Sequence, residues 1–402
     1  MAVEYGKWEK IERKELTPPI PFGVEKIEIL NLDEGSKNDG LETLGNYGMI
    51  YGKSYKLRVS KFAHNIAPKN KNDIKWQAVY LGKGDILTLV HIEKTGDEIV
   101  FYCDNLDYCG QTISFYAFVR ESGKEQNNKA KLEVFCHNRF RWLDKKVFEK
   151  ELSDRTDNRK PYLINQRGTS LCGMACIFYL FAKEQSEKYK KFARDLFRKG
   201  EATCNNYTAS PSKELFEKKR DKNNFPYNKL GFMPIVDFIT LAGVRNTENS
   251  SYKGGNQEFQ AINWPWLMTM LCEKLLGYKN VHSQGCYFPI KEIHTGTHSH
   301  LYTIVFEKLI NEINILLSQK FHLMLLIDSD MINYTEDYTN LKDFVNLEYH
   351  WVVLEAPIGY NKQSFSYNSN LTISVFSWGG CFTSIITLEH FIKNYYGYIK
   401  IR

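Results

Sequence analysis

The sequence lacks the long apolar runs and the secretion signal that would place a protein in or across a membrane. Its longest apolar stretches, such as residues 176–182 and 323–327, fall well short of the roughly 20 residues that span a bilayer. Residues 1–22 carry charges along most of their length and contain no apolar segment of the kind found in Sec-type signals. We therefore expect no membrane partner and no Sec-dependent export.

Cysteine pairs and a strong charge surplus are also missing. The nine cysteines are scattered and form no Cys-x-x-Cys pair, which argues against a disulfide framework or a Cys-ligated zinc site and favours a reducing compartment. The 53 basic and 47 acidic residues leave a net charge of +6, far below the surplus of a dedicated nucleic-acid binder. We expect no nucleic-acid partner.

The chain is instead rich in side chains that build hydrophobic cores, and its length predicts two domains. Hydrophobic residues make up 43% of the 402 residues, including 25 Tyr and 25 Phe. Short alternating runs predict strands at 24–30, 50–59, 74–81, 87–93, 98–102, 112–119 and 131–136. Trp76 and Tyr108 resemble the core Trp and the tyrosine corner of immunoglobulin-like domains. We expect an N-terminal extension at 1–22 and an immunoglobulin-like β-sandwich at 23–139.

The pattern changes after this region. Residues 140–160 are rich in Lys, Glu, Asp and Arg and predict a charged linker that is helical in part. A period of 3.6 residues then predicts helices at 171–183, 186–198, 213–219, 233–242, 266–276 and 301–319. Strands are predicted at 321–327, 349–354, 372–378 and 397–401. Helices followed by antiparallel strands predict an α+β domain over 161–402.

The strongest chemical signal is a loop that leads into an apolar helix at Cys172. A thiol in the first helical turn lies at the positive end of the helix dipole, which predicts a lowered pKa and a nucleophilic thiolate. The unpaired N–H groups of that turn can bind an oxyanion, and the side-chain amide of Gln166 can supply a second donor. The alternative is a buried structural cysteine, which is the role predicted for Cys176 one turn later.

A thiolate nucleophile needs a base, and His350 at the start of a predicted strand is the best candidate. The alternative is a structural histidine bonded to a backbone carbonyl. Pairing strands 349–354 and 372–378 around the loop between them places Ser377 opposite His350 and on the same face of the sheet.

Together these residues resemble those of papain-like cysteine peptidases. The matching positions are Gln166, Cys172, His350, Ser377-Trp378-Gly379 and the closing Gly397-Tyr398-Ile399. The resemblance implies a papain-like domain over 161–402, with Cys172 as nucleophile, His350 as general base and acid, and Gln166 as oxyanion donor. It also implies that Trp378 shields His350 from water, and we expect no cofactor. The Cys-Gly-Met-Ala run is similar to bacterial peptidases that process bacteriocin leaders, which share this fold.

The sequence departs from the family at one position. The asparagine that orients the family's histidine falls on Phe376, which cannot accept a ring proton. Ser377 is the favoured substitute, and an unoriented Cys–His dyad is the alternative. Weaker substitutes are Asn346, Glu348, Asp328 and Asp330.

Two further clusters support rival interpretations. His294, His298 and His300 have a spacing that suits zinc, which makes a metal hydrolase the rival enzyme class. However, no HExxH motif is present, and the polar run around these histidines is typical of the cap of the helix that follows, so we expect no metal site. The run Trp264-Pro265-Trp266 fits either a substrate groove or packing in a core or an interface, and packing is the favoured interpretation.

The biological setting is inferred from composition and domain order. The abundance of Lys, Asn, Ile and Tyr is typical of AT-rich bacterial genomes. A sandwich in front of a peptidase, without a Sec signal, resembles type VI secretion effectors. That resemblance implies a toxin made in the cytoplasm and exported by a non-Sec route into a recipient cell. Its partners would be a protein or peptide substrate, an immunity protein and the secretion apparatus. The alternatives are a cytoplasmic maturation peptidase and a catalytically degenerate adaptor that binds through the sandwich.

Overall fold

A computed structural model describes residues 23–36, 46–82, 84–121, 124–126, 128–256, 258–285, 299–332 and 349–402. These residues form two compact units that divide between His137 and Asn138, with residues 35 and 36 grouped with the second unit. The chain combines helices with several antiparallel sheets, so the predicted mixture of an all-β part and an α+β part is confirmed at that level.

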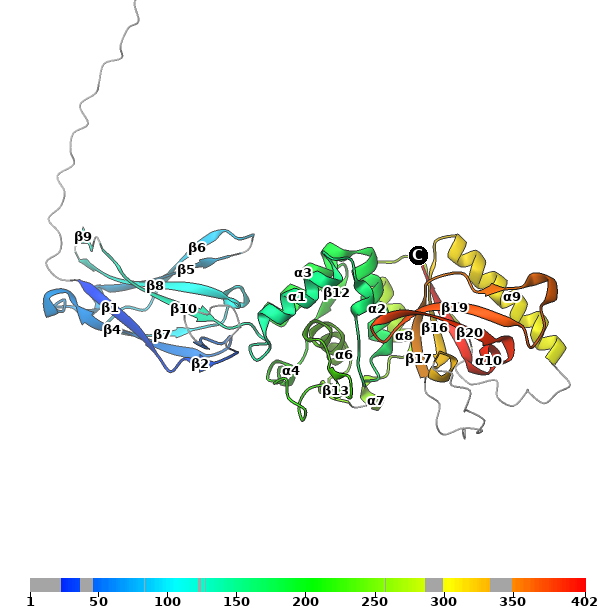
Figure 1. Ribbon diagram of the computed structural model, residues 1–402. Coiled ribbons are helices and arrows are strands. Elements are labelled where there is room, and N and C mark those ends of the chain that lie inside the picture. Colours follow the sequence, from blue (N-terminus) through cyan, green and yellow to red (C-terminus); the bar gives the residue numbers. More distant parts are fainter. Residues whose placement is uncertain are drawn as a thin grey trace, which may run out of the picture. The chain divides into compact units, whose positions relative to one another are not determined.

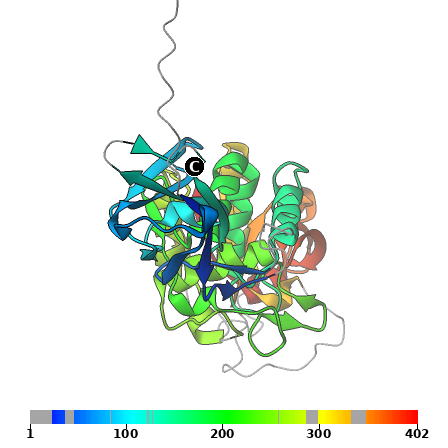
Figure 2. The ribbon, with the colours of Figure 1, turned by 90° about the vertical axis from the view of Figure 1, so that its left-hand side faces the viewer.

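The first unit consists of two antiparallel sheets with a core between them (Figures 1 and 2). One sheet has the order β1(Val24–Leu30)-β4(Ser54–Phe62)-β7(Glu98–Tyr102). The other has the order β10(Ala130–Cys136)-β8(Gln111–Glu121)-β5(Ile74–Leu81)-β6(Leu87–Ile92), and β9(Lys124–Glu125) pairs with β8. A separate two-stranded antiparallel sheet pairs β2(Asp33–Glu34) with β3(Tyr47–Gly48).

Alternation of polar and apolar residues decides which side chains enter this core. In β4, Tyr55 and Leu57 are buried while Lys56 and Arg58 are exposed, as the two-residue period of a strand requires. Trp76 is fully buried, and its indole N–H donates to the Gly96 carbonyl at 2.9 Å. The hydrophobic effect and this satisfied hydrogen bond together hold the two sheets.

The segment expected to be a charged linker is part of the second unit. It contains α1(Lys145–Arg155), which begins after Asp144, whose carboxylate accepts the N–H of Lys146 at 2.8 Å. Phe148 and Leu152, one turn apart, are buried in the core of that unit. Of the charged residues that suggested a linker, Lys146 and Lys150 are exposed, whereas Arg155 is buried.

The next helices along the second unit precede its large sheet, as predicted. They are α2(Cys172–Glu184), α3(Ser186–Lys199), α4(Lys213–Phe216), α5(Ile235–Asp237), a π-helical turn at Phe238–Ala242, α6(Gly243–Glu248), α7(Glu258–Ala261) and α8(Pro265–Lys274). Two small hairpins accompany them, β11(Ala202–Cys204)-β12(Tyr207–Ala209) and β13(Tyr227–Asn228)-β14(Gly231–Phe232). Every residue of α2 from Cys172 to Ala182 is buried, because this helix is apolar on all sides.

An antiparallel sheet completes the second unit and separates two hydrophobic cores. Its strand order is β15(Val281–Gly285)-β21(Tyr395–Ile401)-β16(His322–Asp328)-β17(Tyr349–Leu354)-β19(Asn370–Ser377)-β18(Gly359–Tyr360), with β20(Gly380–Thr387) on β19. Trp351, Val353 and Phe376 face the core that contains α2. Val352 and Leu354 face the core formed with α9(Ser299–Ser318) and α10(Leu388–Asn394) (Figure 1).

The pairing of β17 with β19 differs from the register predicted by the sequence. Val353 lies opposite Phe376 and Leu354 opposite Val375, which shifts the predicted pairing by two residues. Because side chains alternate between faces with a period of two, a shift of two keeps Ser377 on the same face as His350. The predicted pairing was therefore wrong, but the predicted face was correct.

The structure bears on two predictions, those for a membrane and for a metal ion. Within the described ranges, no helix combines the length and apolar character needed to cross a membrane. His294 and His298 lie outside the described residues, as do Asn346 and Glu348. In the part of the chain that the structure describes, no group of three or more His, Cys, Asp or Glu side chains is arranged to hold a metal ion.

Candidate active site

Cys172 is the first residue of α2, as the sequence predicts. Leu171, which precedes it, provides no side-chain cap, so the N–H groups of the first turn must find other acceptors. The Met174 N–H donates to the side-chain oxygen of Asn263 at 3.2 Å. A Cβ atom on Gly173 would lie only 2.6 Å from the Asn263 side chain, so the glycine permits this close approach.

The electrostatic environment of Cys172 differs from the prediction. Burial raises the pKa of the thiol above its ordinary value. Hydrogen bonds from the backbone N–H groups of Trp351, Gly173 and Cys172 itself act in the opposite direction and do not overcome burial. The predicted lowering was wrong because the side chain is only 8% exposed, and the helix-dipole argument omitted the cost of placing a thiolate there.

His350 lies in β17 and is also buried. Its Nε2 atom lies 2.7 Å from the Ser377 hydroxyl, and the Trp378 ring stacks on the imidazole with a centroid distance of 4.3 Å. Burial lowers the pKa of His350 to about 3, so the ring is neutral near pH 7. The structure thus brings together three of the residues that the sequence singled out.

The helix that begins with Cys172, α2, packs against β17, the strand that carries His350. The Trp351 N–H is one of the donors to the Cys172 sulfur, which places the thiol beside the residue that follows His350. The Trp351 indole N–H donates to the main-chain oxygen of Asn263 at 2.9 Å. Asn263 therefore contacts the elements that carry the thiol and the imidazole, a role that the sequence analysis missed.

Phe376 and the weaker candidate Asp328 make other contacts. Phe376 is fully buried on the opposite face of β19 from Ser377, where its ring stacks on Tyr179 at 3.9 Å. The Asp328 carboxylate accepts the Tyr396 hydroxyl at 3.0 Å and the Asp330 N–H at 3.1 Å, which is turn chemistry of the ordinary kind. Of the candidates that the structure describes, Ser377 is the one bonded to the imidazole.

The turn after Ser377 explains how Trp378 is placed over the histidine. Trp378 and Gly379 form the two central residues between β19 and β20, with φ values of 43° and 81°. Positive φ at both positions is typical of a type I′ hairpin turn. A Cβ atom on residue 379 would lie 2.4 Å from the Asn165 side chain, so glycine is required there for space as well as conformation.

Gln166, the predicted oxyanion donor, is buried in the loop before α2. Its main-chain oxygen accepts the Thr169 hydroxyl at 2.8 Å, which fixes the loop. The neighbouring Asn165 donates from its side-chain nitrogen to the Trp378 carbonyl at 2.7 Å. This loop therefore joins the segment before Cys172 to the turn that covers His350.

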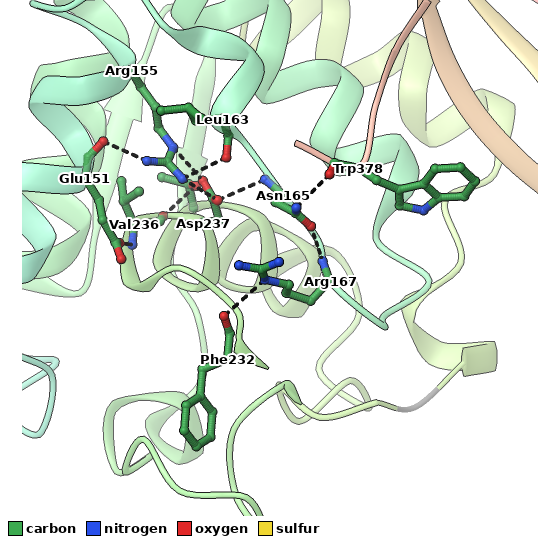
Figure 3. A network of polar contacts seen from close by, with 10 residues as sticks. Glu151, Arg155, Leu163, Asn165, Arg167, Phe232, Val236, Asp237 and Trp378 are labelled. Carbon is green, nitrogen blue, oxygen red and sulfur yellow. Dashed lines mark hydrogen bonds and ion pairs between the residues drawn. The ribbon is translucent and has the colours of Figure 1, made fainter. Parts of the chain in front are cut away.

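A buried network of polar contacts anchors the same loop (Figure 3). The Asp237 carboxylate accepts the Asn165 N–H at 2.9 Å and forms a two-pronged ion pair with Arg155 at 3.0 and 2.7 Å. Arg155 also donates to the Leu163 carbonyl at 3.1 Å. Glu151 accepts the Val236 N–H nearby, and burial raises its pKa to about 7. Of these residues, only the segment around 165 was marked by the sequence.

The burial of His350 predicts a specific dependence of stability on pH. An unfolded chain binds a proton at this histidine below pH 6.5, whereas the folded chain does so only near pH 3. The contribution of His350 to stability is therefore complete above pH 6.5 and falls by up to about 1.4 kcal/mol per pH unit as the pH drops. We expect the His350→Gln variant to lose less stability than the wild type between pH 6.5 and 4, as measured by urea unfolding.

Burial also lowers the pKa values of His322 and His390. The wild type and the His350→Gln variant both retain these residues, so the difference between their pH slopes reports on His350. Equal pH slopes for the two proteins would show that the histidine is solvated.

The arrangement has the parts needed for thiol chemistry, namely a sulfur among backbone N–H donors, a neutral imidazole with one nitrogen held by a hydroxyl, and an indole cover. Comparison with protein-family models, curated proteins and solved structures finds no match for this chain.

Proposed function

We propose that the second unit is a papain-like cysteine peptidase domain that hydrolyses amide bonds. The observation that carries the proposal is the Ser377–His350 hydrogen bond in β strands that lie against the Cys172 helix. In the proposed tautomer, Nε2 donates its proton to Ser377 and Nδ1 is the free base. A neutral imidazole in this form can accept a proton from the thiol.

The proposed reaction follows from these groups. As the Cys172 sulfur attacks the carbonyl carbon, its proton passes to Nδ1 of His350, and the oxyanion binds the Cys172 N–H and the Gln166 side-chain amide. His350 then protonates the leaving amine, and the C–N bond breaks to give a thioester. Water attacks the thioester while His350 takes its proton. The acid is released, and the proton returns to the sulfur.

The neutral resting state is compatible with this reaction. Burial disfavours a lone thiolate and a lone imidazolium. Proton transfer during the attack avoids either charge alone. Catalysis would then depend on geometry more than on a preformed thiolate, which makes the positions of Ser377 and Trp378 important.

For the first unit we propose an immunoglobulin-like sandwich that docks the protein to a partner. Two packed antiparallel sheets with a buried Trp76 support the fold. We further propose a type VI effector toxin with an immunity protein, exported by a non-Sec route. The composition and the order of the two parts support this setting.

A second candidate is a catalytically degenerate adaptor. The raised pKa of the Cys172 thiol is the observation that favours it, because an inert buried cysteine has the same property.

The experiment that separates these candidates uses a peptidyl vinyl sulfone, in which addition of a thiol must be accompanied by protonation of the neighbouring carbon. Mass spectrometry of the full-length protein would compare labelling at Cys172 and Cys381. Cys381 is the exposed member among the described cysteines and reports non-specific reaction. We expect labelling of Cys172 at least about tenfold faster than of Cys381, and a loss of that advantage in His350→Ala.

The matched control is His322→Ala, which removes another histidine of lowered pKa in the same unit. It should leave labelling of Cys172 unchanged. Equal labelling of the two cysteines, unaffected by His350→Ala in a folded protein, would contradict the peptidase proposal and favour the adaptor.

A further inference from the structure

The outer face of α9 is apolar where a surface helix is usually charged. The inner face packs on β16 and enters the core with side chains such as Phe306 and Ile310. On the outer face, Leu301 is 61% exposed, Val305 is 58% exposed and Ile315 is 55% exposed. Neighbouring exposed aliphatic side chains on one face of an element are typical of a surface that binds another protein.

The exposed residues of this face follow a heptad pattern. They recur at alternating spacings of four and three residues and form the α9 stripe, which consists of Leu301, Val305, Lys308, Glu312, Ile315 and Gln319. Gln319 follows the last residue of α9, but its N–H still donates to the Ile315 carbonyl at 3.0 Å, so the helical path continues to it. Residues at this spacing lie in one line along a helix, and two helices pack side by side along such lines.

The α9 stripe is complementary to a second copy of itself when the two helices run antiparallel. A two-fold axis at the level of residue 310 sets Lys308 of each copy against Glu312 of the other. The same axis sets Val305 against Ile315. It also sets Leu301 against the methylene groups of Gln319. Opposite charges therefore meet at the centre of the pair, and aliphatic side chains meet on both sides of them.

The two charges disfavour other pairings of the same face. A parallel pair in register would set each Lys308 against Lys308 and each Glu312 against Glu312, and like charges in contact are destabilising. An antiparallel pair displaced by one heptad would set Glu312 against Leu301 or Ile315. Exposed ion pairs contribute little free energy, so the aliphatic contacts supply the attraction and the charges select the register.

The Glu312 carboxylate is held in place within a single copy. One of its oxygens accepts the Tyr398 hydroxyl of β21 at 2.7 Å. A carboxylate accepts several hydrogen bonds on its two oxygens, so this contact leaves capacity for an ammonium group. An acceptor that is already ordered loses less conformational entropy when a partner binds.

We propose that the α9 stripe is a self-association surface through which two copies of this chain form an antiparallel, two-fold symmetric helix pair. A standard protein interface buries about 1,600 Å² in total, and a single pair of helices covers less. We therefore expect a reversible dimer with a dissociation constant in the micromolar range. The inference goes beyond the proposed peptidase function and does not rest on it.

Sedimentation equilibrium of the full chain, from low micromolar to near-millimolar concentration, tests the proposal. We expect the weight-average mass to rise with concentration from that of a monomer toward that of a dimer. Ile315→Arg and Val305→Arg should each weaken association at least about tenfold, because each places a cation among aliphatic side chains. The matched control is Leu89→Arg, which changes a side chain that is 52% exposed on β6 in the first unit and should leave association unchanged.

Exchange of the two charges tests the register. Lys308→Glu should weaken self-association because it gathers four carboxylates around the axis, and Glu312→Lys should weaken it because it gathers four ammonium groups there. An equimolar mixture of these two single variants should associate about as tightly as the wild type, since each copy then meets the opposite charges. Recovery in the mixture would also show that both variants are folded.

Three outcomes would overturn the proposal. The first is a wild type that stays monomeric over the whole concentration range, which would mean that a second copy does not cover this face. The second is association that survives Ile315→Arg or is lost with Leu89→Arg, which would assign it to another surface. The third is a mixture of the two charge variants that associates no better than either variant alone.

Discussion

Replacing Asp237 by alanine is expected to lower the free energy of unfolding of the second unit by about 3–5 kcal/mol. The side chains of Arg155 and Asp237 are 3% and 0% exposed, so the substitution leaves a buried guanidinium without its counter-charge. It also removes the acceptor of the Asn165 N–H. Urea unfolding of the full chain, followed through its helical signal, measures this unit, because the α-helices of the described residues all lie in it.

The chain provides a matched control for this variant in an exposed ion pair. Glu149 pairs with Arg194 at 2.7 Å, but the two side chains are 35% and 49% exposed. Removing Glu149 by substitution with alanine should therefore cost less than about 1 kcal/mol. A double variant, Asp237→Leu with Arg155→Leu, should recover part of the loss, because no unpaired charge remains. Equal costs for Asp237→Ala and Glu149→Ala would contradict a buried, paired network.

Ser377→Ala is expected to slow the reaction of Cys172 by about 10²-fold without a comparable loss of stability. The hydroxyl holds Nε2 of His350 at 2.7 Å, and without it the ring can rotate and change tautomer. Rates of labelling by the peptidyl vinyl sulfone measure the effect. Ser377→Thr, which keeps the hydroxyl, should retain most of the rate.

Ser374→Ala is the control for Ser377→Ala. Ser374 lies on the same strand, and its hydroxyl bonds to Thr383 on the exposed side of the sheet at 2.8 Å. This variant removes a strand hydroxyl of the same kind away from the imidazole and should react at the wild-type rate. If Ser377→Ala also reacted at that rate, His350 would not need the serine for its orientation.

Local patterns predicted much of this molecule, because they depend on the chain's own neighbours. Alternation located β4 and β5, and an unbroken apolar run located α2 with Cys172 at its start. The same patterns predicted helical structure within 140–160 but assigned the segment to a linker, because its many charged residues concealed the buried pair Phe148 and Leu152. A helix with a narrow apolar stripe is easily taken for a linker.

The features that could not be predicted depend on contacts between distant segments. Arg155 meets Asp237 across 82 positions, and Asn165 meets Trp378 across 213. The periodicity of apolar residues along a sequence does not indicate which distant residues will pair. The predicted direction of the Cys172 pKa shift was wrong for the same reason. Burial of the thiol, in a helix that packs against the distant β17, outweighs the local effect of the helix terminus. The predicted register of β17 and β19 was wrong by two residues. Because side chains alternate with a period of two, the prediction still placed Ser377 on the correct face of the sheet.

The hairpin turn at Trp378 illustrates a compromise between stability and activity. A left-handed backbone costs a non-glycine residue roughly 1 kcal/mol, and asparagine would be the usual choice at the first position of such a turn. The chain places tryptophan there at φ 43°, with its ring stacked on the imidazole. A protein engineered for stability alone would carry Asn-Gly at these two positions and leave His350 open to water. The turn thus gives up stability and covers the imidazole that is proposed as the catalytic base.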